Sequence, residues 1–247
     1  MKFYKSSFSY DYSFPTVTLA YFLRYPNPYS KHVLSTDVID RYIDPETNRL
    51  HTTRLVLKRS KVPSAMLKFI PKGLAGPGGA SQSYVVEKSI VDVKEGWMKT
   101  ESRNMEWTGI LSVVESQTFQ RQAPSTLVRY EQVGSFTEGL EEKEQEKEWT
   151  SCNAVVTFVS RLGQTRLRRK DGPPADGEIE APRGFFASWS TTGIQRTIEM
   201  VGVKRTKDAL VNGRNGMNMV LDRLRSGGIV AALEGMRKDR EAGLVPA

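Results

Sequence analysis

Basic side chains at three separate places in the chain could together bind a phosphate group. A phosphate ester needs several hydrogen-bond donors, and the planar guanidinium of arginine can bind two of its oxygens at once. The candidates are Arg24 and His32 beside a proline-rich turn, Lys58, Arg59 and Lys61 at the end of a strand-like run, and Lys204, Arg205, Lys207 and Arg214 in a helix-like region. The alternative is that these residues are simply solvated, as basic residues at strand ends and on helices commonly are.

Residues for metal or covalent chemistry are few. The two histidines, His32 and His51, and the single cysteine, Cys152, are too few for a zinc site. Cys152 lies in a strand-like run without a local histidine, which favours core packing over nucleophilic catalysis. The glycine-rich stretch at 76–79 is not followed by the Gly-Lys-Ser/Thr of a phosphate-binding loop. We therefore expect no metal, no cofactor and no catalytic residues.

The proline-rich turn must position the first two basic residues. The sequence Arg-Tyr-Pro-Asn-Pro-Tyr-Ser at 24–30 joins a helix-like run at 14–22 to a strand-like run at 31–43. Proline fixes φ and keeps the preceding residue out of the helical region, so the helix must end here. We expect Arg24 and His32 to be held on a stiff turn at the mouth of whatever the helix and the strand enclose.

Patterns of apolar and turn residues predict about seven strands and a helical C-terminal part. The strand-like runs lie at 3–10, 31–43, 50–57, 83–93, 97–105, 109–121 and 148–161. Nearly every residue from Val155 to Val159 is apolar, which predicts a strand buried on both faces. Apolar residues at helical spacing run from Ile194 to Leu224, and a second amphipathic helix follows Gly227-Gly228. Glycines within the long helix, at 202, 213 and 216, predict a bend.

These elements predict an α+β fold in which a long bent C-terminal helix grips an antiparallel sheet. Such a sheet must bury one face, and the helix is its obvious cover, with a cavity wherever side chains leave space between them. We expect one domain over 1–225 and an amphipathic helical extension over 226–247. The charge-rich segment at 138–148 and the segment rich in Pro and Gly at 164–183 are expected to be mobile insertions.

The segment from 63 to 79 combines a short helix-like run with a loop rich in Gly and Pro. Exposed apolar residues on a flexible loop are costly unless they meet a ligand, a partner or a membrane. We therefore interpret this segment as a mobile apolar lid, and the alternative is a plain surface connection. The apolar residues of the predicted lid are Met66, Leu67, Phe69, Ile70 and Leu74.

Composition indicates a soluble protein with an anionic partner. The net charge is +8 and the mean hydropathy is −0.44. Phosphate groups, nucleic acid or an acidic membrane surface would all suit this charge, but the aromatic residues form no RNA-binding signature. No apolar run is long enough to cross a bilayer. The first residues resemble neither a secretory signal nor a transit peptide, so the sequence alone predicts a cytosolic protein.

The turn at 24–30 resembles the signature of the PRELI/Ups family, the phospholipid-transfer proteins of the mitochondrial intermembrane space. It is more similar to the phosphatidic-acid branch than to the phosphatidylserine branch, and the resemblance extends over 3–61, 85–119 and about 194–224. It implies a curved antiparallel sheet gripped by a long helix, with a short helix and loop as a lid over a lipid cavity. It also replaces the cytosolic prediction with a location in the intermembrane space, peripheral on the membranes.

The resemblance further implies which residues bind the lipid and what the protein does. A family position that is often lysine is Asn212 here, which weakens the charge of the helix at that point. The implied function is non-enzymatic transfer of phosphatidic acid between the outer and inner membranes, feeding cardiolipin synthesis. The implied partners are a small twin Cys-x9-Cys helical-hairpin protein, forming a heterodimer, and an anionic membrane surface, but no nucleic acid. The implied headgroup-binding residues are Arg24, His32, Arg59, Lys61 and Arg205.

Three alternatives remain open at this point. The same mechanism could carry phosphatidylserine. A protein of the same shape could be a lipid hydrolase, for which Glu87, Asp92 and Glu101 could supply carboxylates. The chain could also be a scaffold that binds an acidic membrane and a partner without transferring lipid.

Overall fold

The computed structural model describes residues 2–61, 80–106, 108, 111–122, 148–159 and 191–244. The predicted lid, with Met66, Leu67, Phe69, Ile70 and Leu74, lies outside the described residues, as do both predicted insertions apart from Glu148. The elements are β1 (Lys2–Tyr10), α1 (Phe14–Phe22), the 3-10 helix η1 (Pro28–Ser30), β2 (Val33–Ile43), β3 (Leu50–Lys61), β4 (Ala80–Asp92), β5 (Trp97–Asn104), β6 (Ser112–Gln122), β7 (Trp149–Val159) and α4 (Thr191–Leu244).

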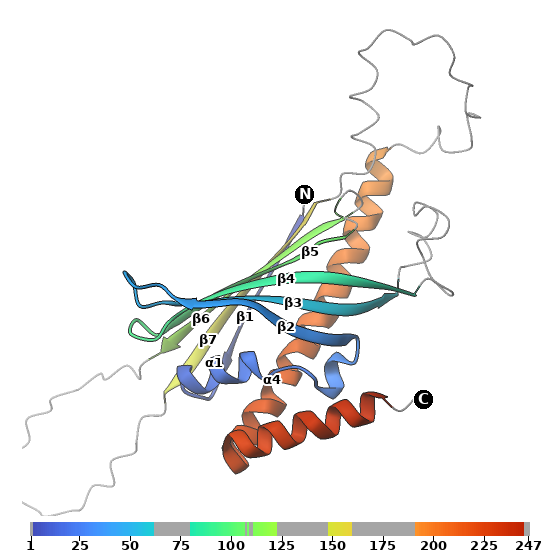
Figure 1. The fold of residues 1–247 in the computed structure, drawn as a ribbon. Coiled ribbons are helices and arrows are strands. Elements are labelled where there is room, and N and C mark those ends of the chain that lie inside the picture. The colour runs from blue at the N-terminus through green and yellow to red at the C-terminus, as the bar shows by residue number, and fades with distance from the viewer. Residues whose placement is uncertain are drawn as a thin grey trace, which may run out of the picture.

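The described strands form one curved antiparallel sheet of seven strands in the order β1-β7-β6-β5-β4-β3-β2 (Figure 1). The chain runs back and forth from β2 to β7, and β1 then pairs with β7 along its whole length. Helices α1 and α4 cover one face of this sheet, which we call the inner face. The predicted α+β fold, with a sheet gripped by a long C-terminal helix, is confirmed.

The first helix begins and ends where the sequence predicts. Ser13 is extended and Pro15 lies in the first turn, where proline loses no hydrogen bond. The amide of Leu23 donates to the carbonyl oxygen of Leu19 at 3.1 Å, and the chain then enters the proline-rich turn, where proline cannot continue a helix. The turn therefore starts directly after the last helical residue.

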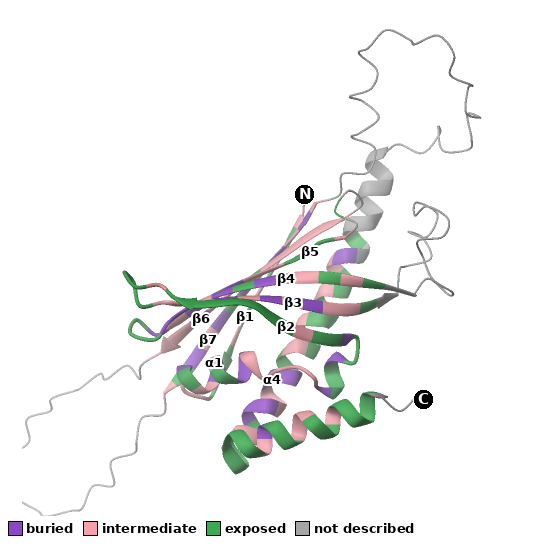
Figure 2. Cartoon of the chain, viewed as in Figure 1, coloured by how far each residue is buried: buried purple, intermediate pink, exposed green. Residues whose placement is uncertain are grey.

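The core lies between the inner face, α1 and the part of α4 that follows residue 216. Figure 2 shows the buried residues on β7, on the middle strands and along this part of α4. Because side chains alternate along a strand, only every second residue of each strand reaches this core. The buried residues of this core cluster are Tyr10, Phe14, Val17, Ala20, Tyr21, Val91, Met98, Phe119, Cys152, Met217, Val220 and Leu221.

The prediction that the last strand is buried on both faces is wrong. In β7, Cys152, Val156 and Phe158 are buried on the inner face, whereas Val155 and Val159 are only partly buried. The described helices all lie on the inner face (Figure 1). Among the described residues, no second layer covers the outer face of the sheet.

The long helix breaks at one point only within the described residues. Non-helical backbone angles occur at Gly227 and at Gly228, which has a φ of +66°. The predicted end of the helix at this pair is therefore confirmed, and the backbone angles at the earlier glycines are helical. Two of those glycines instead permit close packing. A Cβ atom at Gly202 would lie 3.1 Å from the ring of Phe158, and one at Gly216 would lie 2.8 Å from Nδ2 of Asn27.

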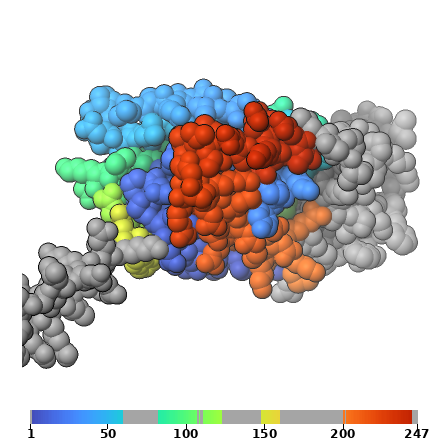
Figure 3. All heavy atoms as spheres, turned by 90° about the horizontal axis from the view of Figure 1, so that it is seen from below, coloured from blue at the N-terminus to red at the C-terminus, as the bar shows by residue number. Residues whose placement is uncertain are grey.

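After the break, the second half of α4 folds back beside η1 (Figure 3). Ala232 is fully buried, and Nη1 of Arg223 donates to Oδ2 of Asp239 at 2.7 Å across the two halves. The predicted C-terminal extension therefore packs against the rest of the chain. No described helix combines the length and the apolar character that crossing a bilayer would require.

Candidate functional site

A cavity of about 100 Å³ lies between the inner face of the sheet, the proline-rich turn and α4. Strands β3 to β6 supply its floor, and α4 supplies its roof through Leu210, Gly213 and Met217. Most of the ionisable side chains at its wall are basic. The charged and titratable lining residues, apart from tyrosines, are Arg24, His32, Lys58, Glu87, Glu115 and Arg214.

A buried ion triad joins two lining residues of the cavity, Arg24 and Glu87, to Arg54 of β3. Glu87 accepts from Nε of Arg54 at 2.8 Å and from a terminal nitrogen of each of Arg54 and Arg24. Nη1 of Arg54 also donates to the carbonyl oxygen of Phe22 at 3.2 Å, which ties β3 to the end of α1. The exposed fractions of the side chains are 4% for Arg54, 5% for Glu87 and 14% for Arg24, so the triad is almost removed from water.

Glu87 and Arg24 of the triad stay charged near neutral pH. Burial would raise the pKa of Glu87, but Arg24 and Arg54 together hold it below its ordinary value. Burial likewise opposes the charge of Arg24, yet Glu87 and the neighbouring tyrosines raise its pKa well above the usual value. One carboxylate shared by two guanidinium groups leaves a net charge of +1 in a region of low dielectric, where a charge acts strongly on its surroundings.

Arg24 retains an unused hydrogen-bond donor. Its guanidinium carbon lies 3.7 Å from the centre of the Tyr21 ring, a stacked cation–π arrangement that fixes its plane. One terminal nitrogen binds Glu87, but the buried Nε has no hydrogen-bond partner in the described structure. A buried donor without a partner is costly, so an acceptor placed beside Arg24 in the cavity would be stabilised.

The turn that carries Arg24 is clamped from both sides. The side chain of Asn27 donates to the carbonyl oxygen of Arg24 at 2.5 Å and accepts from the amide of Tyr29 at 2.9 Å. Gly216 of α4 lies directly against this carboxamide, because a glycine there leaves room for it. On the other side, the amide of Arg59 donates to the carbonyl oxygen of His32 at 2.7 Å and ties the turn to β3.

His32 lies at the wall of the cavity with Lys58 beside it. Partial burial and then the positive charge of Lys58 lower the pKa of His32 below its ordinary value of 6.5. The imidazole is therefore neutral at neutral pH and can serve as either donor or acceptor there. The positive charge at this end of the cavity comes from Lys58 and Arg24 rather than from the histidine.

The structure brings only some of the predicted residues together. Arg24 and His32 line the cavity. Arg59 is exposed and follows Lys58 along β3, so strand alternation places it on the outer face. Lys61 ends β3, but the position of its side chain lies outside the described structure. Arg205 is exposed on α4 and lies outside the cavity wall. The headgroup role of these residues stays a prediction.

Several cavity residues were not predicted as headgroup-binding residues. Arg54 and Glu87 form the triad together with Arg24. The sequence indicated Glu87 only as a possible carboxylate for hydrolysis. Lys58 and Arg214 replace their neighbours as the basic lining residues of β3 and α4, and Asn212 is exposed. Alternation along β3 could have identified Lys58, because it shares a face with Arg54 and with the buried Val56.

The volume of the cavity is too small for a whole phospholipid. Pockets for drug-sized ligands measure roughly 300–1,000 Å³, whereas this cavity measures about 100 Å³. Two acyl chains need more volume than this cavity provides, so they would require α4 or neighbouring segments to move. A second, more open cavity of about 350 Å³ lies between the start of β2 and the end of α4. It lacks the buried triad.

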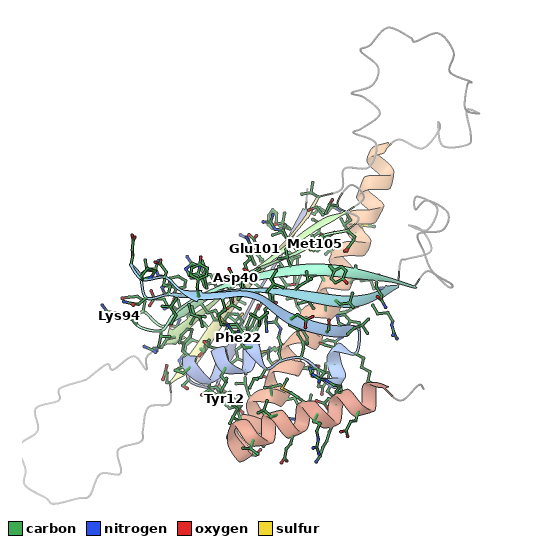
Figure 4. The ribbon with its side chains drawn as sticks, in the orientation of Figure 1. Tyr12, Phe22, Asp40, Lys94, Glu101 and Met105 are labelled. Carbon is green, nitrogen blue, oxygen red and sulfur yellow. The ribbon has the colours of Figure 1, made fainter. Side chains whose placement is uncertain are left out.

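The carboxylates considered for hydrolysis do not converge on one point. Asp92 accepts from Arg49 and from the amide of Glu95 at the opposite end of β4 from the cavity. Glu101 pairs with Arg103 on an exposed part of β5 (Figure 4). In the described part of the chain, no cluster of three or more His, Cys, Asp or Glu residues could hold a metal ion.

Comparison with known proteins identifies relatives over most of the chain. It is 35% identical to Protein UPS1, mitochondrial, from Saccharomyces cerevisiae over 171 residues, 68% of this chain and 93% of that protein. It is 35% identical to PRELI domain-containing protein 1, mitochondrial, from Homo sapiens over 103 residues, 42% of this chain and 44% of that protein. A crystal structure of a protein from Thermus thermophilus covers 99% of this chain and 100% of its own at a TM-score of 0.35 and 11% identity, which is too low to carry an argument.

The family follows from two independent matches. Residues 15–143, which include the turn, the triad and strands β2 to β6, match the PRELI-like family. The yeast relative is matched over nearly its whole length, and its name, like that of the human relative, places it in mitochondria. The chain therefore belongs to the PRELI-like family.

Proposed function

We propose that this protein is a non-enzymatic carrier that binds phosphatidic acid by its phosphate and moves it between the mitochondrial outer and inner membranes. The observation that carries the proposal is the buried Arg24, which lines the cavity and whose Nε has no hydrogen-bond partner among the described residues. The mitochondrial relatives support the compartment. In this proposal the protein works in the intermembrane space, peripheral on both membranes, and its cargo feeds cardiolipin synthesis.

The charge of the cavity suits a phosphate monoester. Counting Arg54 of the triad with the lining residues gives four arginine or lysine charges and two carboxylate charges, a net charge of +2 with His32 neutral. A phosphate monoester carries about −1.5 to −2 charge near neutral pH. Phosphatidic acid presents such a group, whereas a phosphodiester headgroup without further charge presents about one negative charge. The match therefore favours phosphatidic acid over most other phospholipids.

A carrier needs to shield the acyl chains as well. Each CH₂ group of a lipid chain is worth about 0.8 kcal/mol when it leaves water, so the two chains must find an apolar surface inside the protein. Phe8, Val85 and Phe119 line the cavity and Leu210 faces it from α4. In this proposal, the apolar segment at 63–79 acts as a lid and α4 separates from the sheet as the chains enter.

A carrier mechanism needs no catalytic group, and the arrangement of carboxylates supports a non-enzymatic function. Glu87 is held by two guanidinium groups and has a lowered pKa, so it is a poor base. We keep two partners as proposals. One is a small twin Cys-x9-Cys helical-hairpin protein bound as a heterodimer. The other is an anionic membrane surface, which attracts basic residues by about 1 kcal/mol each.

The test is a liposome transfer assay with labelled phosphatidic acid, combined with native mass spectrometry of the purified protein. We expect one bound phospholipid per chain and transfer between vesicles. Replacing Arg24 with Gln should reduce transfer by at least about tenfold, because a charge-assisted bond to phosphate is lost. Arg103→Gln on an exposed part of β5 is the matched control and should leave transfer unchanged. Undiminished transfer by the Arg24 variant would contradict the headgroup site, and a lipid-free, inactive protein would favour a scaffold.

A further inference from the structure

The second cavity lies against an unpaired edge of the sheet. Strand β2 is last in the strand order, so its outer edge has no strand neighbour among the described residues. Ser35 and Thr36 of β2 line this cavity, and Ala242 and Gly243 at the end of α4 line it from the other side. Figure 3 shows the second half of α4 (red) beside β2 (light blue). The cavity of about 350 Å³ is therefore a groove between a strand edge and a helix, which we call the edge groove.

The strand edge offers backbone groups to a further strand. An edge strand leaves alternate N–H and C=O groups without a partner in the sheet. The pairing of β2 with β3 shifts register after Val33, is regular from Ser35 to Val38, and then shifts again. Such bulges protect the rest of an edge against indiscriminate pairing. The regular stretch begins in the edge groove, where an added strand can pair with it.

The charge of the edge groove suits an acidic ligand. The charged residues that line it are Lys31, Asp239 and Arg240. Asp239 accepts from Nη1 of Arg223 at 2.7 Å, so its charge is already paired. Lys31 and Arg240 are exposed, and neither forms a salt bridge with a described residue. The edge groove therefore presents two cations to which carboxylates can bind.

The rest of the lining is largely apolar and includes a stiff wall. Pro26, Pro28 and Val33 line the edge groove, and the fixed φ of proline limits the movement of this wall. An extended peptide would use all of these features. Its backbone would pair with the strand edge, alternate side chains would meet the apolar wall, and acidic side chains would meet the cations. An acyl chain would leave both the backbone groups and the cations without partners.

We propose that the edge groove binds an extended acidic segment of a partner protein, which adds a strand to β2 and lies against the end of α4. The helical wall of the edge groove, at 239–243, lies outside residues 15–143, which match the PRELI-like family. Tyr25, Asn27 and Ser30 line both cavities, so the proline-rich turn separates the edge groove from the headgroup cavity. The inference goes beyond the proposed carrier function and does not depend on it.

The test measures binding of short fluorescein-labelled peptides to the full chain by fluorescence anisotropy at physiological salt, which screens distant charges. The probe peptide alternates valine with glutamate. One control peptide has lysine for each glutamate, and another has proline for each valine, which removes backbone N–H donors. We expect the wild type to bind the probe at least about tenfold more tightly than either control peptide, because backbone pairing and charge attraction both contribute.

Charge reversal identifies the site of binding. Arg240→Glu should weaken binding of the probe by at least about tenfold, because an attraction to its carboxylates becomes a repulsion. Lys238→Glu makes the same change at an exposed position of the same helix outside the edge groove, and it should leave the dissociation constant unchanged. Bound probe should also slow hydrogen exchange of the backbone amides at 33–38, because amides of the strand edge gain partners.

Several results would overturn the proposal. These are no binding of the probe, equal binding of the proline peptide, an unchanged dissociation constant for Arg240→Glu, or unchanged exchange at 33–38 with bound probe. Slower exchange at 33–38 with phosphatidic acid vesicles but not with the probe would assign the edge groove to a membrane surface, and it would also overturn the proposal. None of these results measures lipid transfer, so a failure here leaves the carrier function standing.

Discussion

Replacing Glu87 with Gln should destabilise the folded protein by about 3–5 kcal/mol, the usual cost of removing one partner from a buried ion pair. The carboxylate is 5% exposed and binds two arginines, of which Arg54 is 4% and Arg24 is 14% exposed. Glutamine has the same shape as glutamate but only one acceptor oxygen. Its amide NH₂ group, which is a donor, would face the N–H donors of one of the two guanidinium groups, so no hydrogen bond could form there. Two buried positive charges then remain without a counterion. The substitution also makes the net charge of the cavity more positive, because one carboxylate is removed.

The loss of stability is measured by unfolding the wild type and the variant in urea and monitoring the unfolding by circular dichroism. An unchanged slope with a lower midpoint identifies a change in the free energy of unfolding rather than in compactness. Glu101→Gln is the control, since the pair of Glu101 with Arg103 is 43% and 56% exposed and such pairs contribute about 0–1 kcal/mol. A loss below about 1 kcal/mol for Glu87→Gln would show that the triad does not hold the two arginines.

The pH dependence gives a second readout of the same carboxylate. The folded pKa of Glu87 lies below its ordinary value of 4.5. Its ionised form therefore stabilises the fold at pH values above 4.5, and this contribution disappears as the pH falls through the lowered pKa. The difference in the free energy of unfolding between the wild type and Glu87→Gln should be largest near pH 7 and should become smaller in acid. If this difference in the free energy of unfolding stays constant into strong acid, the charge of Glu87 is not the cause of the destabilisation.

Two further predictions follow from the packing. Gly216→Ala should reduce phosphatidic acid transfer and cost about 1–3 kcal/mol, because its Cβ would lie 2.8 Å from Nδ2 of Asn27 and displace the turn. Gly243→Ala, where nothing lies within 4 Å, is the control, and equal effects of the two would contradict the clamp. Burial raises the pKa of the Cys152 thiol to about 12. Native protein should therefore react with iodoacetamide at pH 8 at least about a hundred times more slowly than urea-unfolded protein, and rapid native labelling would exclude a buried thiol.

Local patterns were enough to predict the elements. Proline in the turn ends α1 after Phe22, and alternation of apolar residues places all seven described strands to within a few residues at each end. Both signals act over a few neighbouring residues, so they can be read without the tertiary structure. The break at Gly227 and Gly228 was found for the same reason, because a φ of +66° at Gly228 requires a residue without a side chain.

Local patterns were less informative where the outcome depends on which segment packs against them. The apolar run in β7 predicts burial on two faces, but the described helices cover only one. Glycines in α4 predict a bend when the helix is considered alone. In the structure, Gly202 and Gly216 instead permit approach to Phe158 and Asn27, which belong to distant parts of the chain. No feature of the helix itself distinguishes these two uses of glycine.

The sequence by itself determined that this chain makes an antiparallel sheet, a helix ended by prolines and a basic turn with Arg24, because spacing and backbone chemistry are local properties. Only the tertiary structure decided which charges meet. Glu87 lies 63 residues from Arg24 and 33 residues from Arg54, and the three join because strand register and the turn bring them to one buried point. Pairing across strands is set by the packing of the whole sheet, so residues that line a cavity cannot be chosen from their charge alone.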